Sequence, residues 1–131
     1  MDQGESPIVL LVEDDIDGRR VCADWLTHAG FDVHEAHNGL QALERAFDTP
    51  PDVVVTDLNI PGIDGFELTR RLKSDPRTSE VPVLAVTGYP AYASDPGRAH
   101  RAGCDAVLPK PCSPHNLEAV IRSLIDARPR T

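Results

Sequence analysis

The sequence of 131 residues lacks long apolar runs, paired cysteines and an N-terminal targeting signal. No apolar run approaches the ~20 residues that a membrane-spanning helix needs. The first residues, MDQGESP, do not have the basic start and apolar centre of a signal peptide. The three cysteines are odd in number and form no CxxC motif, which argues against a disulfide framework and a thiolate zinc site. We therefore expect a cytoplasmic protein with no membrane association.

Basic residues are also scarce. The chain has 13 Lys and Arg against 21 Asp and Glu, and its formal net charge is -8. Nucleic-acid binding needs clustered Lys and Arg, so this balance argues against a nucleic-acid partner. The length fits one domain, which we expect to span residues 7–126 with loose termini at 1–6 and 127–131.

Short apolar runs alternate with longer amphipathic stretches along the chain. The runs are rich in β-branched residues, as in VVV at 53–55, which is typical of strands buried on both faces of a parallel sheet. We expect strands at residues 8–12, 31–36, 52–56, 81–86 and 106–108.

The intervening stretches have helical spacing and helix-end signals. We expect helices at about 15–28, 38–49, 65–73, 95–102 and 113–125, the fourth of only about two turns. Apolar residues at Ile16, Val21, Trp25 and Leu26 are expected to form the buried face of the first helix, and Leu40 belongs to that of the second.

This alternation predicts an α/β fold of the flavodoxin-like, doubly wound type. Right-handed crossovers favour a five-stranded parallel sheet in the order 2-1-3-4-5, with helices on both faces. In such sheets ligands bind outside the carboxyl ends of the strands, at the switch point between the first and third strands.

Polar residues follow four of the expected strands at this edge. They are Glu13, Asp14 and Asp15 after the first, Asp57 and Asn59 after the third, Thr87 after the fourth and Lys110 after the fifth. Carboxylates gathered this closely repel one another unless a cation lies among them. Mg²⁺ prefers hard oxygen ligands and often takes one or two carboxylates together with phosphate oxygens.

The same residues suit phosphoryl transfer to a carboxylate. Asp57 is positioned to be the nucleophile of a covalent aspartyl phosphate. Mg²⁺, the Lys110 ammonium and the Thr87 hydroxyl can stabilise the charge that spreads over the phosphoryl oxygens.

Four stretches of the sequence resemble the response-regulator receiver domains of two-component signalling: LLVEDD, VVVTDLNIPGIDGFEL, VLAVTG and GCDAVLPKP. The resemblance covers about residues 8–125. It implies a domain that is phosphorylated on Asp57 by a sensor histidine kinase or a histidine phosphotransfer protein, as in a phosphorelay. It also implies a switch of a partner-binding surface and no separate substrate turnover.

The resemblance also assigns roles to single residues. Glu13 and Asp14 match the acidic pair that binds Mg²⁺, and Asn59 matches the position whose backbone carbonyl joins them. Thr87 matches the switch hydroxyl, and Lys110 matches the family's lysine, with a cis peptide expected before Pro111. Asn59 and Tyr89 match positions that tune the lifetime of the phosphoryl group.

Three features depart from the family pattern. The position three residues before the lysine, commonly Tyr or Phe, is Val107 here. The spacing from Thr87 to Lys110 is also about one residue longer than expected, and the helix between them is short. A pseudo-receiver that binds proteins without being phosphorylated is therefore the alternative function.

Plainer interpretations of the same residues also exist. The acids at 13–17 suit any helix N-terminus, and with Asp24 they resemble a calcium-binding EF-hand loop. Asp57 and Thr87 also suit turns, and Lys110 suits a plain surface position. A phosphatase with an Asp nucleophile would need a second acid two residues later, where this chain has Asn59.

Overall fold

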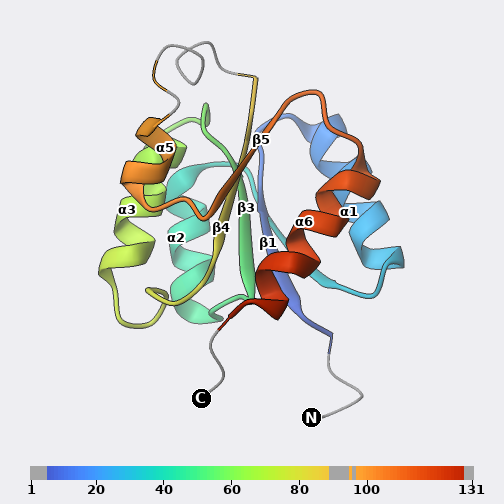
Figure 1. The fold of residues 1–131 in the computed structure, drawn as a ribbon, viewed down its shortest axis with the longest axis horizontal. Helices are drawn as coiled ribbons and strands as arrows, with labels where there is room; N and C mark the ends of the chain where they lie inside the picture. The colour runs from blue at the N-terminus through green and yellow to red at the C-terminus, as the bar shows by residue number, and fades with distance from the viewer. Residues whose placement is uncertain (1–5, 89–94, 96, 129–131) are drawn as a thin grey trace.

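Strands and helices alternate in the computed structural model, which describes residues 6–88, 95 and 97–128 (Figure 1). The elements in chain order are β1 (Ile8–Val12), α1 (Ile16–His28), β2 (Asp32–Ala36), α2 (Gly39–Asp48), β3 (Val53–Asp57), α3 (Gly65–Ser74), β4 (Val83–Thr87), α5 (Gly97–Ala102), β5 (Ala106–Pro109) and α6 (Pro114–Asp126). Among the described residues, no helix is long and apolar enough to cross a membrane.

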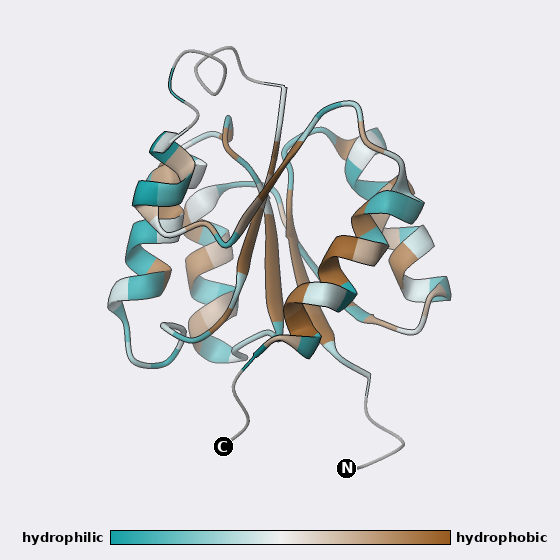
Figure 2. Ribbon diagram, viewed as in Figure 1, coloured by the Kyte–Doolittle hydropathy of each residue, from teal (hydrophilic) through white to brown (hydrophobic). Residues whose placement is uncertain are grey.

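The five strands form one parallel sheet in the order β2-β1-β3-β4-β5. This is the predicted order: the chain passes from β1 to β2 and then crosses over β1 to β3 on its other side. The central strand β3 is buried from Val53 to Thr56, as its unbroken β-branched sequence predicts. Figure 2 shows the strands as the most hydrophobic part of the molecule, enclosed by amphipathic helices.

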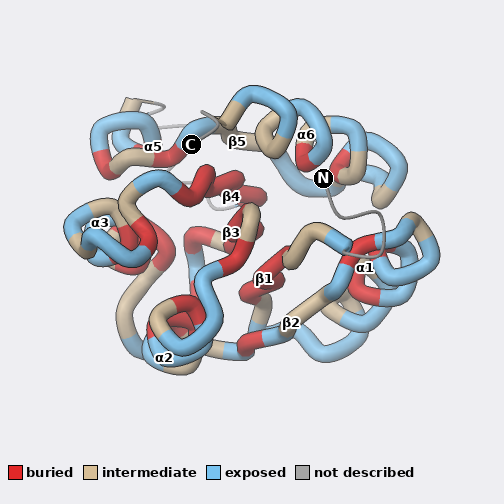
Figure 3. Tube along the Cα trace, turned by 90° about the horizontal axis from the view of Figure 1, so that it is seen from below, coloured by how far each residue is buried: buried red, intermediate tan, exposed pale blue. Residues whose placement is uncertain are grey.

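Helices cover both faces of the sheet. α1 and α6 pack on one face, and α2, α3 and α5 pack on the other (Figures 1 and 3). Each face has its own hydrophobic core. Phe66, Leu68 and Leu72 of α3 fill the first, and Leu26 of α1 with Leu117 and Ile121 of α6 fills the second.

Side-chain caps fix where four helices begin. The capping side chain in each accepts a hydrogen bond from the backbone N–H three residues later. The pairs are Asp15 with Gly18, Asn38 with Gln41, Asp64 with Glu67 and Ser113 with Asn116. The caps predicted at Asn38 and Ser113 are confirmed, and so is the turn after α1, where Gly30 has φ of 104°.

The predicted buried face of α1 is wrong at three of its four residues and right at Leu26. Ile16 and Val21 are both 59% exposed and Trp25 is 42% exposed, whereas Ala23 and Leu26 are buried. Small side chains on the sheet-facing side let α1 lie close to the strands. Trp25 instead lies beside α6, where its indole N–H donates to Glu118 Oε1 at 2.9 Å.

Smaller differences concern helix and strand ends. Leu40, expected in the core, is 55% exposed at the start of α2. α5 is six residues long, as short as predicted, and the Arg98 N–H donates to the Asp95 carbonyl at its start. β3 and β4 each end one residue later than predicted. As a result, Asp57 and Thr87 are the last residues of strands and share the rigidity of the sheet.

Candidate functional site

The side chains predicted to form the site come from the carboxyl ends of neighbouring strands. Asp57 ends β3, Thr87 ends β4, and Glu13 and Lys110 directly follow β1 and β5. Because all the strands run in the same direction, these ends meet at one edge of the sheet (Figure 1). The sheet therefore brings together residues that lie up to 97 positions apart in the sequence.

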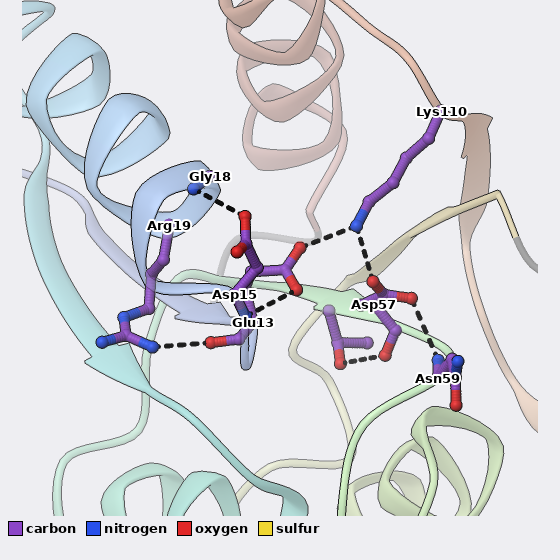
Figure 4. Close-up of polar contacts among 8 residues, drawn as sticks. Glu13, Asp15, Gly18, Arg19, Asp57, Asn59 and Lys110 are labelled. Atoms are coloured by element: carbon purple, nitrogen blue, oxygen red, sulfur yellow. Dashed lines mark hydrogen bonds and ion pairs between the residues drawn. The ribbon is translucent and has the colours of Figure 1, made fainter.

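Lys110 joins the two carboxylates at the centre of the site (Figure 4). Its Nζ donates to Asp57 Oδ2 at 2.6 Å and to Glu13 Oε1 at 2.7 Å. The Asp57 and Glu13 side chains are only 11% and 13% exposed. The Lys110 ammonium thus offsets the charges of two largely buried carboxylates, which would otherwise repel each other.

Hydrogen bonds hold the Asp57 carboxylate in a fixed orientation. Its Oδ1 accepts the backbone N–H of Asn59 at 3.0 Å, while its Oδ2 faces Lys110. The Thr56 hydroxyl donates to the Asp57 carbonyl at 2.8 Å. A carboxylate held at both oxygens on a buried strand presents its oxygens in one direction.

Glu13 is fixed by residues at the start of α1. The backbone N–H of Asp15 donates to Glu13 Oε2 at 3.2 Å, and Arg19 Nη1 donates to the Glu13 carbonyl at 2.8 Å. Arg19 Nε also donates to Glu35 Oε1 at 3.0 Å, which ties the site to β2. Arg19 was not predicted as a site residue. It contacts a backbone carbonyl, and the sequence pattern of charged residues does not indicate such a contact.

Two neighbouring groups complete the edge. Thr87 is 2% exposed, and its carbonyl accepts the Lys110 N–H at 3.0 Å, which sets where the lysine leaves the sheet. The peptide between Lys110 and Pro111 is cis, as expected. Tyr89 lies outside the described residues.

Asp14 stands apart from this cluster. Its side chain is exposed and makes no hydrogen bond or ion pair with the other described residues. Across residues 6–88, 95 and 97–128, no group of three or more His, Cys, Asp and Glu side chains is arranged to hold a metal. The donors nonetheless fit Mg²⁺, because that ion keeps several waters and binds through one or two carboxylates. Glu13 and Asp57 provide two carboxylates within this cluster, and the exposed Asp14 directly follows Glu13 in the chain.

The electrostatics of the site keep Lys110 charged. Partial burial lowers the pKa of Lys110, but the hydrogen bonds and charges of Asp57 and Glu13 raise it more, and the net pKa lies above its ordinary value. The ammonium is therefore present at every physiological pH. A carboxylate nucleophile beside a permanent cation is suited to attack a group that carries spreading negative charge.

The calcium-loop alternative does not agree with the structure. An EF-hand loop needs an irregular twelve-residue segment after a helix. Here β1 precedes the acids, Asp15 caps α1, and the residues from Ile16 to His28 are helical.

Val107 lies where the family pattern commonly has an aromatic residue. It pairs with Ala85 of β4 and packs half-buried against the core on the α3 side.

Comparison with known proteins gives a consistent result. The family model of the response regulator receiver domain matches residues 9–122. The chain is 34% identical over 120 residues to the polar-differentiation response regulator DivK of Brucella anthropi, covering 91% of this chain and 97% of that protein.

Solved structures agree with the sequence comparison. A chemotaxis response regulator of Vibrio cholerae is 27% identical with a TM-score of 0.84, over 92% of this chain and 99% of that one. The receiver domain of a sensor histidine kinase from Pseudomonas aeruginosa, with magnesium coordinated in its active-site cleft, is 27% identical with a TM-score of 0.86. The match covers 94% of this chain and 100% of that domain.

Proposed function

Because the chain belongs to the response-regulator receiver family of two-component signalling, we propose that Asp57 accepts a phosphoryl group from a phosphohistidine in a Mg²⁺-dependent reaction. The observation that carries the proposal is the bridge from Lys110 Nζ to Asp57 Oδ2 and Glu13 Oε1, at 2.6 and 2.7 Å. It places a nucleophile, a second carboxylate and a fixed cation within one hydrogen-bonded group. Family members are signalling switches, so we propose no separate substrate turnover.

The Asp57 carboxylate makes the new bond. One of its oxygens attacks the phosphorus of the incoming phosphoryl group, and the bond between that phosphorus and the donor's imidazole nitrogen breaks. The electron pair leaves with the imidazole. The Asn59 N–H already holds Asp57 Oδ1 at 3.0 Å, so the carboxylate loses little freedom as it reacts.

Lys110 and Thr87 act on the phosphoryl oxygens. The Lys110 ammonium exchanges one of its carboxylate contacts for a phosphoryl oxygen, which keeps its charge paired throughout. We propose that the hydroxyl of Thr87, the last residue of the neighbouring strand, donates to a second oxygen. Both effects stabilise charge that grows in the transition state.

Mg²⁺ would be held by Glu13, Asp14 and Asp57 together with the backbone carbonyl of Asn59. When bound, it would neutralise part of the charge shared by the phosphoryl group and the carboxylates. Asp14 directly follows Glu13 in the chain, and its exposed side chain makes no competing contact with the described residues.

The partners follow from this chemistry. We propose a sensor histidine kinase or a histidine phosphotransfer protein as the donor, within a domain spanning residues 7–126. With Val107 in place of an aromatic ring, no ring on β5 can rotate inward as Thr87 moves. Because of Val107, a second candidate function is a scaffold that binds proteins without being phosphorylated.

The test is the intact mass of the protein after incubation with acetyl phosphate, with and without Mg²⁺. We expect one phosphoryl adduct that requires Mg²⁺ and disappears in Asp57→Asn. Asp126→Asn at the end of α6 is the matched control and should label normally. An adduct that survives Asp57→Asn would show that another residue is the acceptor. A folded protein that takes no phosphoryl group, either from acetyl phosphate or from phosphohistidine donors, would favour the scaffold.

A further inference from the structure

A cavity of about 500 Å³ extends from the phosphorylation site into the α1 and α6 side of the sheet. Its walls come from strand ends, from α1 and from the loop between β5 and α6. The apolar part of the wall is formed by Leu11, Cys22, Val55, Val86, Cys112 and Leu117. The size lies within the range of ~300–1,000 Å³ that is usual for small-molecule sites.

The two cysteines belong to the apolar wall. Burial raises the pKa of both Cys22 and Cys112, and the neighbouring Cys112 raises the pKa of Cys22 further. Both thiols therefore stay protonated at neutral pH and act as small apolar groups, not as nucleophiles or metal ligands.

The mouth of the cavity carries excess negative charge. Glu13, Asp15 and Asp57 line it, against Arg19 and Lys110. Both cations are already engaged, since Lys110 contacts two of these carboxylates and Arg19 Nε lies 3.0 Å from Glu35. The Asp15 carboxylate is exposed to solvent, and among the described residues its only hydrogen-bond partner is the Gly18 N–H.

We propose that this cavity binds a small organic amine, with its apolar body between α1 and α6 and its ammonium group at the Glu13 and Asp15 carboxylates. An anionic head would meet the same carboxylates and be repelled. A neutral molecule would leave the charged mouth unmatched.

A bound amine would also act on the phosphorylation site. Its positive head beside Glu13 opposes a second cation there, and the two ligands weaken each other's binding by the same factor. This consequence rests on the proposed function, whereas the binding itself does not. The titrations below contain no Mg²⁺ and so test the cavity separately.

The first experiment compares three probes by amide chemical-shift titration of the whole chain. They are 1-naphthylmethylamine, 1-naphthylacetate with the same ring and the opposite charge, and methylamine with the head alone. We expect the naphthyl amine to shift amides at residues 18–22, 112–113 and 115–117, and the other two to bind at least tenfold more weakly. Equal binding of the acetate, shifts confined to other residues, or no binding at millimolar amine would each overturn the proposal.

The second experiment uses variants of the protein to test the apolar body and the ammonium group of the amine separately. Cys112→Phe narrows the cavity and should weaken the naphthyl amine about tenfold, whereas Cys104→Ala, a cysteine in the opposite core, should not. Asp15→Asn removes the charge but keeps a good helix cap, and should weaken binding about threefold. Unchanged affinity in Asp15→Asn would overturn the placement of the head, whether or not Cys112→Phe folds.

Discussion

The chain has two lysines against eleven arginines, and each lysine makes two short polar contacts. Lys110 Nζ lies 2.6 and 2.7 Å from two carboxylate oxygens. Lys73 Nζ lies 2.9 Å from both the Val81 carbonyl and Asp105 Oδ2. A compact ammonium fits between two acceptors where a planar guanidinium needs more room.

Lys110→Arg should therefore slow phosphorylation although it keeps the charge. The guanidinium cannot occupy the Nζ position between Asp57 and Glu13 without moving one of them. We expect the rate of adduct formation from acetyl phosphate, followed by intact mass, to fall roughly tenfold. Lys73→Arg is the matched control and should leave the rate unchanged. Equal rates in both variants would show that charge alone, not shape, matters at position 110.

Gly65 shows how closely a helix can approach the site. A Cβ at this position would lie 2.6 Å from the Asp57 carbonyl oxygen and 2.7 Å from the Leu58 Cα. Gly65→Ala should push α3 away from the strand end that carries Asp57, the proposed nucleophile. We expect a loss of about 1–3 kcal/mol in the free energy of unfolding in urea, with slower phosphorylation. Ser74→Ala, exposed at the other end of α3, should change stability by less than ~0.5 kcal/mol.

At the scale of elements, α1 and α6 are joined by polar contacts above their shared core. The Trp25 indole donates to Glu118 Oε1, and Arg122 donates to Glu118 Oε2 and to the Ala29 carbonyl, all at 2.8–2.9 Å. The hydrogen bonds from Trp25 and Arg122 lower the pKa of Glu118 below its ordinary value of 4.5. A group with a lowered pKa stabilises the fold above its ordinary pKa, and this effect is lost as the pH falls through the lowered value.

Trp25→Phe keeps an aromatic ring beside α6 but removes the indole donor. We expect its melting temperature, followed by circular dichroism, to be about 2–4 °C below that of the unmodified protein at pH 7. The difference should shrink as the pH falls below about 4.5 and Glu118 becomes protonated. Glu118→Gln should show the same trend. A difference that persists unchanged to low pH would assign the loss to ring packing instead of the hydrogen bond.

The sequence predicts these elements better than it predicts their faces. The strands are recognisable because runs such as Val53–Val55 are buried on both sides, and the caps at Asn38 and Ser113 are local signals. The buried face of α1 was predicted wrongly because Ile16 and Val21 look like core residues. Only the contact with the sheet, which favours Ala23, decides which face turns inward.

The candidate site was likewise predictable only in part. That Glu13, Asp57 and Lys110 lie together could be predicted because parallel strands end at one edge, and the structure brings these three side chains together. The contribution of Arg19 could not be predicted, since it depends on the direction of the Glu13 carbonyl.

At the scale of the whole molecule, Mg²⁺ should stabilise the fold if the proposed site is correct. A ligand that binds only the folded state, at ten times its dissociation constant, adds about 1.4 kcal/mol and so raises the melting temperature by about 5 °C. Asp14→Asn and Asp57→Asn should lose most of this shift, and a chelator should reverse it. Asp126→Asn should retain it. Because the net charge is -8, sodium chloride at matched ionic strength is the control for general screening.

An equal shift in all variants would mean that the cation acts on the overall charge of the protein and not at the proposed site.

The ion pair between Glu13 and Lys110 also determines at which stage of chain synthesis the proposed site can form. These residues lie 97 positions apart, and the contacts that join α1 to α6 span 93. During synthesis the acidic loop and Asp57 are made long before the lysine that balances them. A growing chain can form the early strands, but its carboxylates have no matching cation until β5 has emerged. The proposed site can thus be complete only after β5 has been synthesised, and ribosome-bound chains that stop short of β5 should take no phosphoryl group from acetyl phosphate.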